Sequence, residues 1–177
     1  MTDDLFWMNE ALTLAKKAAE QGEVPVGAVV VLEGQMIGQG FNRPISRCDP
    51  SAHAEIEAIR AASQHLANYR LVDATLYVTL EPCSMCAGAM VHARIGRLVF
   101  GASEPKAGVA CSQHNFFDQP WLNHSVSVEG GVLAPECSNV MSDFFAHRRE
   151  LKREAKRVSR EAQALQSEVG SSGETVQ

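Results

Sequence analysis

The sequence contains no long apolar run. Nowhere in its 177 residues does it approach the ~20 consecutive apolar residues that a membrane-spanning helix needs. No apolar targeting segment precedes Asp3 either. We therefore expect a cytoplasmic protein without a membrane partner.

Cysteine is scarce and irregularly spaced. The chain holds five cysteines, an odd number that lacks the even framework of a secreted disulfide protein. Cys48, Cys111 and Cys137 have no paired spacing, and we interpret them as ordinary buried or loop residues. Cys83 and Cys86 stand three positions apart, so this pair needs a chemical explanation.

Net positive charge is also lacking, since the formal net charge is −5. The negative charge is unevenly distributed along the chain. Residues 147–160 contain seven Lys or Arg and two Glu, a local charge of +5 that leaves −10 for all other residues. This pattern indicates either a basic surface that steers nucleic acid to one side or simply a solvated helix face.

Length and composition fit one globular domain. A chain of 177 residues with 45% hydrophobic content is ordinary for such a domain. We predict a single domain over residues 1–165. Residues 166–177 are rich in Ser, Gly and Glu, and we predict a disordered tail there.

Periodicity and breaker residues predict alternating helices and strands. Alternation of this kind favours parallel neighbouring strands, with the helices that follow them beginning at one edge of the sheet. The irregular segment 102–123 is long for a connection, as functional or mobile loops often are. The predicted helices cover residues 3–21, 54–66, 83–93 and 134 onward, and the predicted strands cover 24–32, 35–41, 71–80, 97–101 and 125–129.

The cysteine pair follows a proline that comes just after an apolar strand. If Pro82 opens a helix, Cys83 and Cys86 lie at i and i+3 of its first turn and point the same way. The positive end of the helix dipole favours thiolates, which are the form that binds metals. Taken alone, the pair is equally typical of a thioredoxin-like redox site.

His53 and Glu55 add the groups that favour a metal site. Helix start signals at residues 49–51 place His53 at a helix mouth, where it and Glu55 can serve one pocket. One imidazole and two sulfurs leave a fourth position open, as in catalytic zinc sites, whereas structural zinc sites close with four ligands. A closed site would require one of the three unpaired cysteines as its fourth ligand.

The order His-x-Glu and then Pro-Cys-x-x-Cys, at residues 53–55 and 82–86, resembles the signature of the zinc-dependent nucleoside and nucleobase deaminases. Within this group, the chain is similar to the bacterial tRNA adenosine deaminases. The resemblance runs from the first helix to the Phe-Phe-x-x-Arg-Arg segment at 144–149. It implies an α/β fold of the cytidine deaminase-like kind, a three-layer α/β/α sandwich around a five-stranded mixed sheet. It also implies a homodimer.

The resemblance further implies a reaction, the hydrolytic deamination of adenosine to inosine at the wobble position of an arginine tRNA. One zinc ion per subunit would be held by His53, Cys83 and Cys86, and would lower the pKa of a water from ~15.7 toward 7. Glu55 would take the proton of this water, pass it to the ring nitrogen, and later protonate the departing amine.

Six substrate contacts are implied in the same way. Asn42 and the backbone N–H of Ala54 would hold the base, although an Asn before Arg-Pro is also an ordinary turn residue. Basic side chains would meet phosphates and an aromatic ring would stack on a splayed base, as single-stranded RNA recognition requires. The residues that would engage the anticodon stem-loop are Lys106, Asn123, Phe145 and Arg149.

Three other functions remain open on the sequence. A deaminase of free cytosine, cytidine, deoxycytidylate or guanine shares the metal motif, although His53 as first ligand favours the nucleic-acid and guanine-type branch. A non-catalytic RNA-binding or zinc-stabilised protein would not need Glu55, and a redox protein would keep both thiols reactive. Glu81 is interpreted as favourable to the helix dipole rather than as a second acid.

Overall fold

The computed structural model describes the backbone of residues 3–171 and the side chains of residues 3–160 and 163. The chain divides into two compact units, Met1–Met141 and Ser142–Gln177. The division falls inside the predicted domain of residues 1–165 and inside one helix. That helix continues to Ser171, within the predicted tail, and residues 172–177 of the tail lie outside the described residues.

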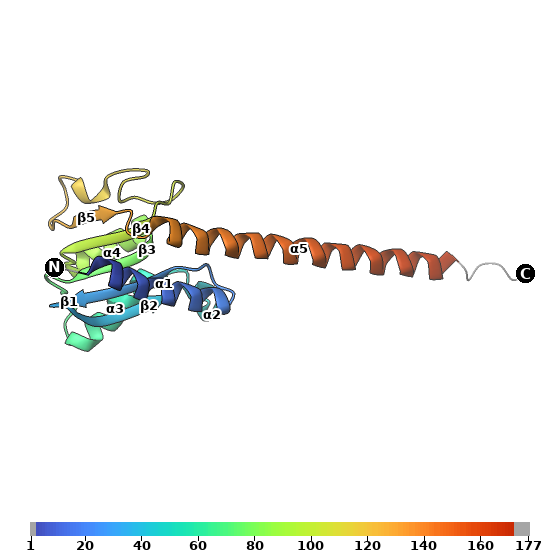
Figure 1. Ribbon diagram of the computed structural model, residues 1–177, viewed down its shortest axis with the longest axis horizontal. Helices are drawn as coiled ribbons and strands as arrows, with labels where there is room; N and C mark the ends of the chain where they lie inside the picture. Colours follow the sequence, from blue (N-terminus) through green and yellow to red (C-terminus); the bar gives the residue numbers. More distant parts are fainter. Residues whose placement is uncertain (1–2, 172–177) are drawn as a thin grey trace, which may run out of the picture. The chain divides into compact units, whose positions relative to one another are not determined.

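The first unit contains the predicted elements in the predicted order (Figure 1). Most boundaries differ from the sequence prediction by only a few residues. The elements are α1 (Asp4–Glu20), β1 (Gly27–Leu32), β2 (Gln35–Phe41), α2 (Pro44–Arg47), α3 (Ala54–Leu66), β3 (Thr75–Leu80), α4 (Ser84–Ala93), β4 (Arg97–Ala102), the 3₁₀ helix η1 (Phe116–Asp118), β5 (Ser127–Gly130) and α5 (Ala134–Ser171), which continues into the second unit.

Two short helices differ from the sequence prediction. The sequence predicts a plain loop before His53, but Pro44 opens a single turn, α2, which ends at Cys48 in the left-handed conformation. The second, η1, interrupts the long segment between β4 and β5. One turn is too short to show helical periodicity, and this is why the pattern misses both.

The sheet confirms the expected fold class. Its strand order is β2-β1-β3-β4-β5. Strand β1 runs antiparallel to β2 and β3, whereas β3, β4 and β5 are mutually parallel neighbours, so the five-stranded sheet is mixed. The parallel half arises because α4 and the long loop 103–126 each carry the chain back to the starting edge of the sheet.

Two apolar cores lie on opposite faces of the sheet, because alternate strand residues point to opposite sides. Val30 and Leu76 belong to the core that α3 and α4 cover, and Val29 and Tyr77 belong to the core that α1 and the first turns of α5 cover. The first unit is therefore a three-layer α/β/α sandwich. Within residues 3–171, no helix is both long and apolar enough to span a bilayer.

Glycines in β2 let α3 approach the sheet very closely. A Cβ on Gly40 would lie 2.6 Å from the backbone nitrogen of Ala58, and a Cβ on Gly38 would lie 2.6 Å from that of Ala62. Real side chains do not tolerate such contacts. The absence of side chains at these two positions therefore sets where α3 lies, and with it the position of His53 at its start.

We predict that Gly40→Ala forces α3 away from β2. Overpacking of this kind costs about 1–3 kcal/mol of unfolding free energy, which urea denaturation would measure. Gly88→Ala is the matched control, because its Cβ would meet nothing within 4 Å and alanine favours a helix interior. Equal stability of Gly40→Ala and the unmodified protein would contradict the close-approach argument.

Candidate metal centre and active site

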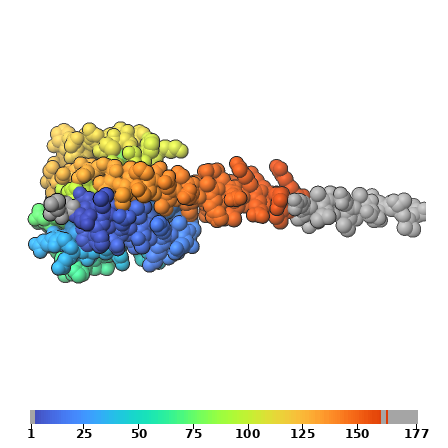
Figure 2. All heavy atoms as spheres, viewed as in Figure 1, coloured from blue at the N-terminus to red at the C-terminus, as the bar shows by residue number. Residues whose placement is uncertain are grey.

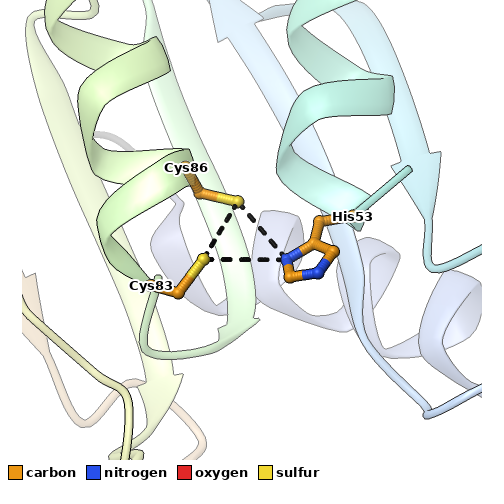
Figure 3. Close-up of side chains that lie close together, drawn as sticks. All are labelled: His53, Cys83 and Cys86. Atoms are coloured by element: carbon orange, nitrogen blue, oxygen red, sulfur yellow. Dashed lines mark hydrogen bonds between the residues drawn. The ribbon is translucent and has the colours of Figure 1, made fainter. Parts of the chain in front are cut away.

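The N-termini of α3 and α4 lie next to each other (Figure 3). His53 is the N-cap residue of α3 and Cys83 is the N-cap residue of α4, both with extended backbone and neither with a side-chain capping bond to its own helix. Cys86 lies in the first turn of α4 and is buried. The prediction that His53 stands at a helix mouth is confirmed.

The three side chains converge on a common centre (Figure 3). The Sγ atoms of Cys83 and Cys86 are 3.8 Å apart, and His53 Nδ1 lies 3.8 Å and 3.6 Å from them respectively. A tetrahedral ion with Zn–S bonds of ~2.3 Å and a Zn–N bond of ~2.0 Å would separate its ligand atoms by ~3.5–3.8 Å. The trio therefore fits a zinc ion without rearrangement.

The trio also leaves a coordination position open. Among the described residues, the group of His, Cys, Asp and Glu side chains close enough to share an ion consists of these three. Cys48 and Cys111 are exposed and Cys137 is buried apart from the group. A closed structural site with a fourth cysteine is therefore not formed in the part of the chain described, and three ligands with an open position are typical of catalytic zinc sites.

The electrostatics of the trio differ from one side chain to the next. The contact with Cys86 lowers the pKa of the Cys83 thiol to about 3, against the opposing effect of burial, and the contact with His53 adds to the lowering. The contact with Cys83 and then burial raise the pKa of Cys86. The hydrogen bond with Cys83 raises the pKa of His53. The lowered pKa favours the thiolate of Cys83, the form that ligates a metal, whereas Cys86 and His53 have to lose a proton when a metal binds.

Glu55 lies two residues beyond His53 and is only 4% exposed. Burial raises the pKa of its carboxyl group, with opposing contributions from a backbone hydrogen bond and the His53 charge. A buried carboxyl with a raised pKa can gain and lose a proton closer to neutral pH than an exposed one. Glu55 is thus suited to proton transfer beside the trio.

His53, Cys83 and Glu55 line one cavity of about 260 Å³. Its walls come from the segment leading into β1, the segment that includes α2, the end of β3 and the loop after β4. That loop belongs to residues 103–126, which gather at one side of the first unit (Figure 2, yellow). The residues that line the cavity are Val24, Val26, Asn42, Pro44, His53, Glu55, Leu80, Glu81, Cys83, Glu104 and Ala107.

Known proteins share this sequence and fold. The model of the MafB19-like deaminase family matches residues 2–149. The tRNA-specific adenosine deaminase of Haemophilus influenzae is 54% identical over 147 residues, which are 82% of this chain and 85% of that protein. The enzyme of the same name from Bacillus subtilis is 45% identical over 157 residues, 89% of this chain and 98% of that one. The chain belongs to the tRNA-specific adenosine deaminase family.

Solved structures agree with this deaminase assignment. A structure from work on A-to-I editing by tRNA:A34 deaminases superposes with a TM-score of 0.74 at 46% identity, covering 76% of this chain and 98% of that chain. A guanine deaminase from Nitrosomonas europaea superposes with a TM-score of 0.71 at 23% identity, over 80% of this chain and 84% of that one. At that identity the second likeness shows the fold alone.

Of the six residues that the sequence links to substrate, Asn42 lines the deaminase cavity, whereas Ala54 is fully buried and donates its backbone N–H to Asn42. Asn42 lines the cavity and is 8% exposed, and its Oδ1 accepts a hydrogen bond of 2.9 Å from the backbone N–H of Ala54. The four residues predicted to meet the anticodon stem-loop lie elsewhere. Lys106 is exposed on the loop between two residues that line the cavity, Glu104 and Ala107.

Asn123 does not reach the cavity. It lines a separate hollow beside Phe117 and His124, and its Oδ1 accepts a hydrogen bond of 2.8 Å from Arg94. Phe145 and Arg149 belong to the second unit, where both are exposed. The RNA roles of these residues remain predictions.

Sequence reasoning misses the roles of two buried acids of the deaminase. Glu23 is 1% exposed, and its carboxylate accepts hydrogen bonds from the backbone N–H groups of Ile45 (3.2 Å) and Ser46 (2.7 Å), which fixes α2. The sequence suggests only a helix-dipole role for Glu81, but its carboxylate accepts hydrogen bonds from the loop after β4. Contacts between segments far apart in sequence leave no local pattern.

We predict graded cysteine reactivity in the metal-loaded deaminase. Cys48 and Cys111 are exposed and should react with an alkylating reagent directly, whereas Cys83 and Cys86 should react only after a chelator is added. Mass spectrometry of the alkylated peptides would measure this order. His53→Ala should expose the pair without chelator, and His65→Ala, an exposed histidine of the same helix, should not. Free reaction of both thiols in the metal-loaded protein would indicate a redox pair.

Proposed function

We propose that this deaminase converts adenosine to inosine by hydrolysis at the wobble position of a tRNA anticodon, with an arginine tRNA as substrate. The observation that carries the proposal is the His53, Cys83 and Cys86 trio with a buried Glu55 at the same cavity. The tRNA substrate is supported by the names of relatives that match 82–91% of the chain.

The proposed cofactor is one zinc ion per subunit, held by His53, Cys83 and Cys86. When bound, zinc lowers the pKa of a coordinated water toward ~7 and so supplies a nucleophile at neutral pH. Two sulfurs and one imidazole suit zinc rather than magnesium or calcium, which prefer oxygen ligands.

Glu55 would carry every proton of the reaction. It would accept a proton from the attacking water and deliver it to N1 of the adenine ring, which makes C6 electrophilic. After C6 becomes tetrahedral, Glu55 would carry the second proton to the amine, which leaves as ammonia. One carboxyl group can serve both steps because each proton it gains is the one it next donates.

The cavity also supports recognition of a single base. Its volume of about 260 Å³ lies just below the ~300–1,000 Å³ of drug-sized ligand pockets, which suits one flipped nucleobase. The hydrogen bond from Ala54 occupies Asn42 Oδ1 and orients the side-chain amide. The Asn42 amide nitrogen would then donate to the base. Asn42 would thus hold the local backbone through its oxygen and the substrate through its nitrogen.

The remaining RNA contacts would come from the loop and from α5. At ~100° per residue, the seven Lys and Arg of residues 148–160 fall within one half of the helix surface, and Phe145 falls within the same half. Glu150, Glu154 and the apolar Phe144, Leu151 and Val158 fall on the other half. We propose that the basic half meets RNA phosphates while Phe145 stacks on a base. Lys106 and Asn123 of the first unit are proposed as RNA contacts in their own right.

We also propose that the enzyme works as a homodimer in the cytoplasm. Both proposals follow from the family, because a tRNA substrate has to be met where tRNA is present and members of this group are homodimers. Sedimentation analysis at micromolar concentration would test the dimer.

Parallel incubation with unmodified tRNAs and free nucleosides tests the substrate. Nuclease digestion and mass spectrometry would measure inosine in each. The proposal expects inosine at the wobble position of an arginine tRNA and little in free adenosine. Inosine in free nucleosides but in no tRNA would favour a free-base or nucleoside deaminase instead.

We predict that Glu55→Gln lowers kcat by at least about 10²-fold, since general acid–base catalysis contributes ~10²–10⁴ in rate. Zinc content by plasma mass spectrometry should remain near one ion per chain, because Glu55 is not a ligand. Glu57→Gln on the same helix is the control, because its carboxylate pairs with the exposed Arg47 and Arg60 and does not line the cavity. Unchanged turnover in Glu55→Gln would contradict the assignment of Glu55 as the proton carrier.

A second prediction concerns α5. Arg149→Ala combined with Arg153→Ala should raise KM for tRNA about tenfold, and it should reduce the salt dependence of binding by about one unit of log–log slope for each phosphate that is no longer neutralised. Turnover of a free nucleoside should stay the same. Arg70→Ala, an exposed arginine of the first unit, removes the same kind of charge and should leave tRNA binding unaltered. An equal weakening of binding in that control would indicate a general effect of net charge.

A further inference from the structure

Glu81 has an unusual position for an acidic residue. It lies between the last residue of β3 and the Pro82-Cys83 pair that opens α4, and it is 3% exposed. A buried carboxylate is costly unless its oxygens receive hydrogen bonds. The donors that stabilise it therefore show what this residue does in the fold.

All the donors to this carboxylate come from one loop. Oε1 accepts hydrogen bonds of 2.8 Å from the backbone N–H groups of both Cys111 and Ser112. Oε2 accepts a bond of 3.0 Å from the backbone N–H of Glu104 and another from the hydroxyl of Ser112. One side chain thus ties the two ends of residues 104–112 together.

The backbone beside Glu81 extends the same attachment. The N–H of Glu81 donates to the carbonyl of Ala102 at 2.8 Å, and the carbonyl of Pro82 accepts from Val109 at 3.0 Å. The loop is therefore held at its start, its middle and its end by two consecutive residues, and these residues precede the metal-ligating Cys83.

Gly108 shows that the loop is shaped around the carboxylate. A Cβ at this position would collide with Glu81 Cδ, and it would lie 2.5 Å from Oε2 and 2.6 Å from the carbonyl oxygen of Glu104. The N–H of Gly108 donates to that carbonyl at 2.8 Å, which closes a turn over the acid. Only glycine allows this approach.

We propose that Glu81 is a positioning residue that holds loop 104–112 as a wall of the substrate cavity. The loop contributes Glu104 and Ala107 to the cavity lining and presents Lys106 to solvent between them. Glu81 also lines the cavity, but its carboxylate accepts four hydrogen bonds from this loop, so we assign it the placement of the loop rather than a role as proton carrier. The inference rests on the proposed tRNA substrate and extends it.

The test uses Glu81→Gln in the full-length, zinc-loaded enzyme. An amide side chain keeps the size but can accept at only one of its two ends, so backbone donors of the loop lose their partner. We expect KM for the tRNA to rise about tenfold while kcat stays within about threefold, because a buried donor without an acceptor disfavours the binding-competent loop. Zinc content should stay the same.

Ser112→Ala is the matched control. It removes the hydroxyl donor but keeps the backbone bonds from Cys111 and Ser112, so KM should change by less than about threefold. Gly108→Ala provides a second variant if Glu81→Gln does not fold. It displaces the loop while the carboxylate stays intact, and it should raise KM in the same way.

Amide hydrogen exchange separates this inference from the proposed function. In Glu81→Gln, the amides of Glu104, Cys111 and Ser112 should exchange at least about tenfold faster than in the unmodified enzyme. Unchanged exchange, or a fall in kcat as large as the rise in KM, would overturn the positioning role. A third outcome is possible: exchange is faster in Glu81→Gln, but the unmodified enzyme makes no inosine in any tRNA. That result would support Glu81 as the residue that holds the loop and would reject the proposed tRNA substrate.

Discussion

The convergence of two helix N-termini at one edge of the sheet is the constraint on which the rest of this structure depends. Helix α3 lies close to β2 because two glycines there have no side chains, and α4 begins directly after the buried strand β3. Each helix begins at a potential metal ligand, so the packing of the two helices against the sheet sets the distances within the His53, Cys83 and Cys86 trio. The chemistry therefore follows from how the layers pack.

Three buried glutamates serve the cavity in different ways. Burial is the largest influence on the pKa of the Glu55 carboxyl and raises it, which suits this residue to carry protons. Glu23 and Glu81 are equally buried, but backbone N–H groups of α2 and of the long loop satisfy their oxygens. Environment rather than residue type thus separates an acid with a raised pKa from acids whose oxygens accept hydrogen bonds from neighbouring segments.

Much of this arrangement could be predicted from local sequence. Strand and helix periodicity indicates the elements of the first unit, and the motif spacing places His53, Cys83 and Cys86 at helix mouths. The rest depends on contacts between distant segments. The single-turn helix α2 has no periodicity, Asn123 bonds to Arg94 across a loop of irregular shape, and Glu81 meets donors about thirty residues away. No local pattern encodes such contacts.

X-ray absorption spectroscopy at the zinc edge tests the central claim most directly. The metal-loaded enzyme should show two sulfur neighbours at ~2.3 Å, one imidazole nitrogen at ~2.0 Å and one further light atom in the position left open by the protein. A shell of four sulfurs, or a site made only of oxygens, would contradict the account.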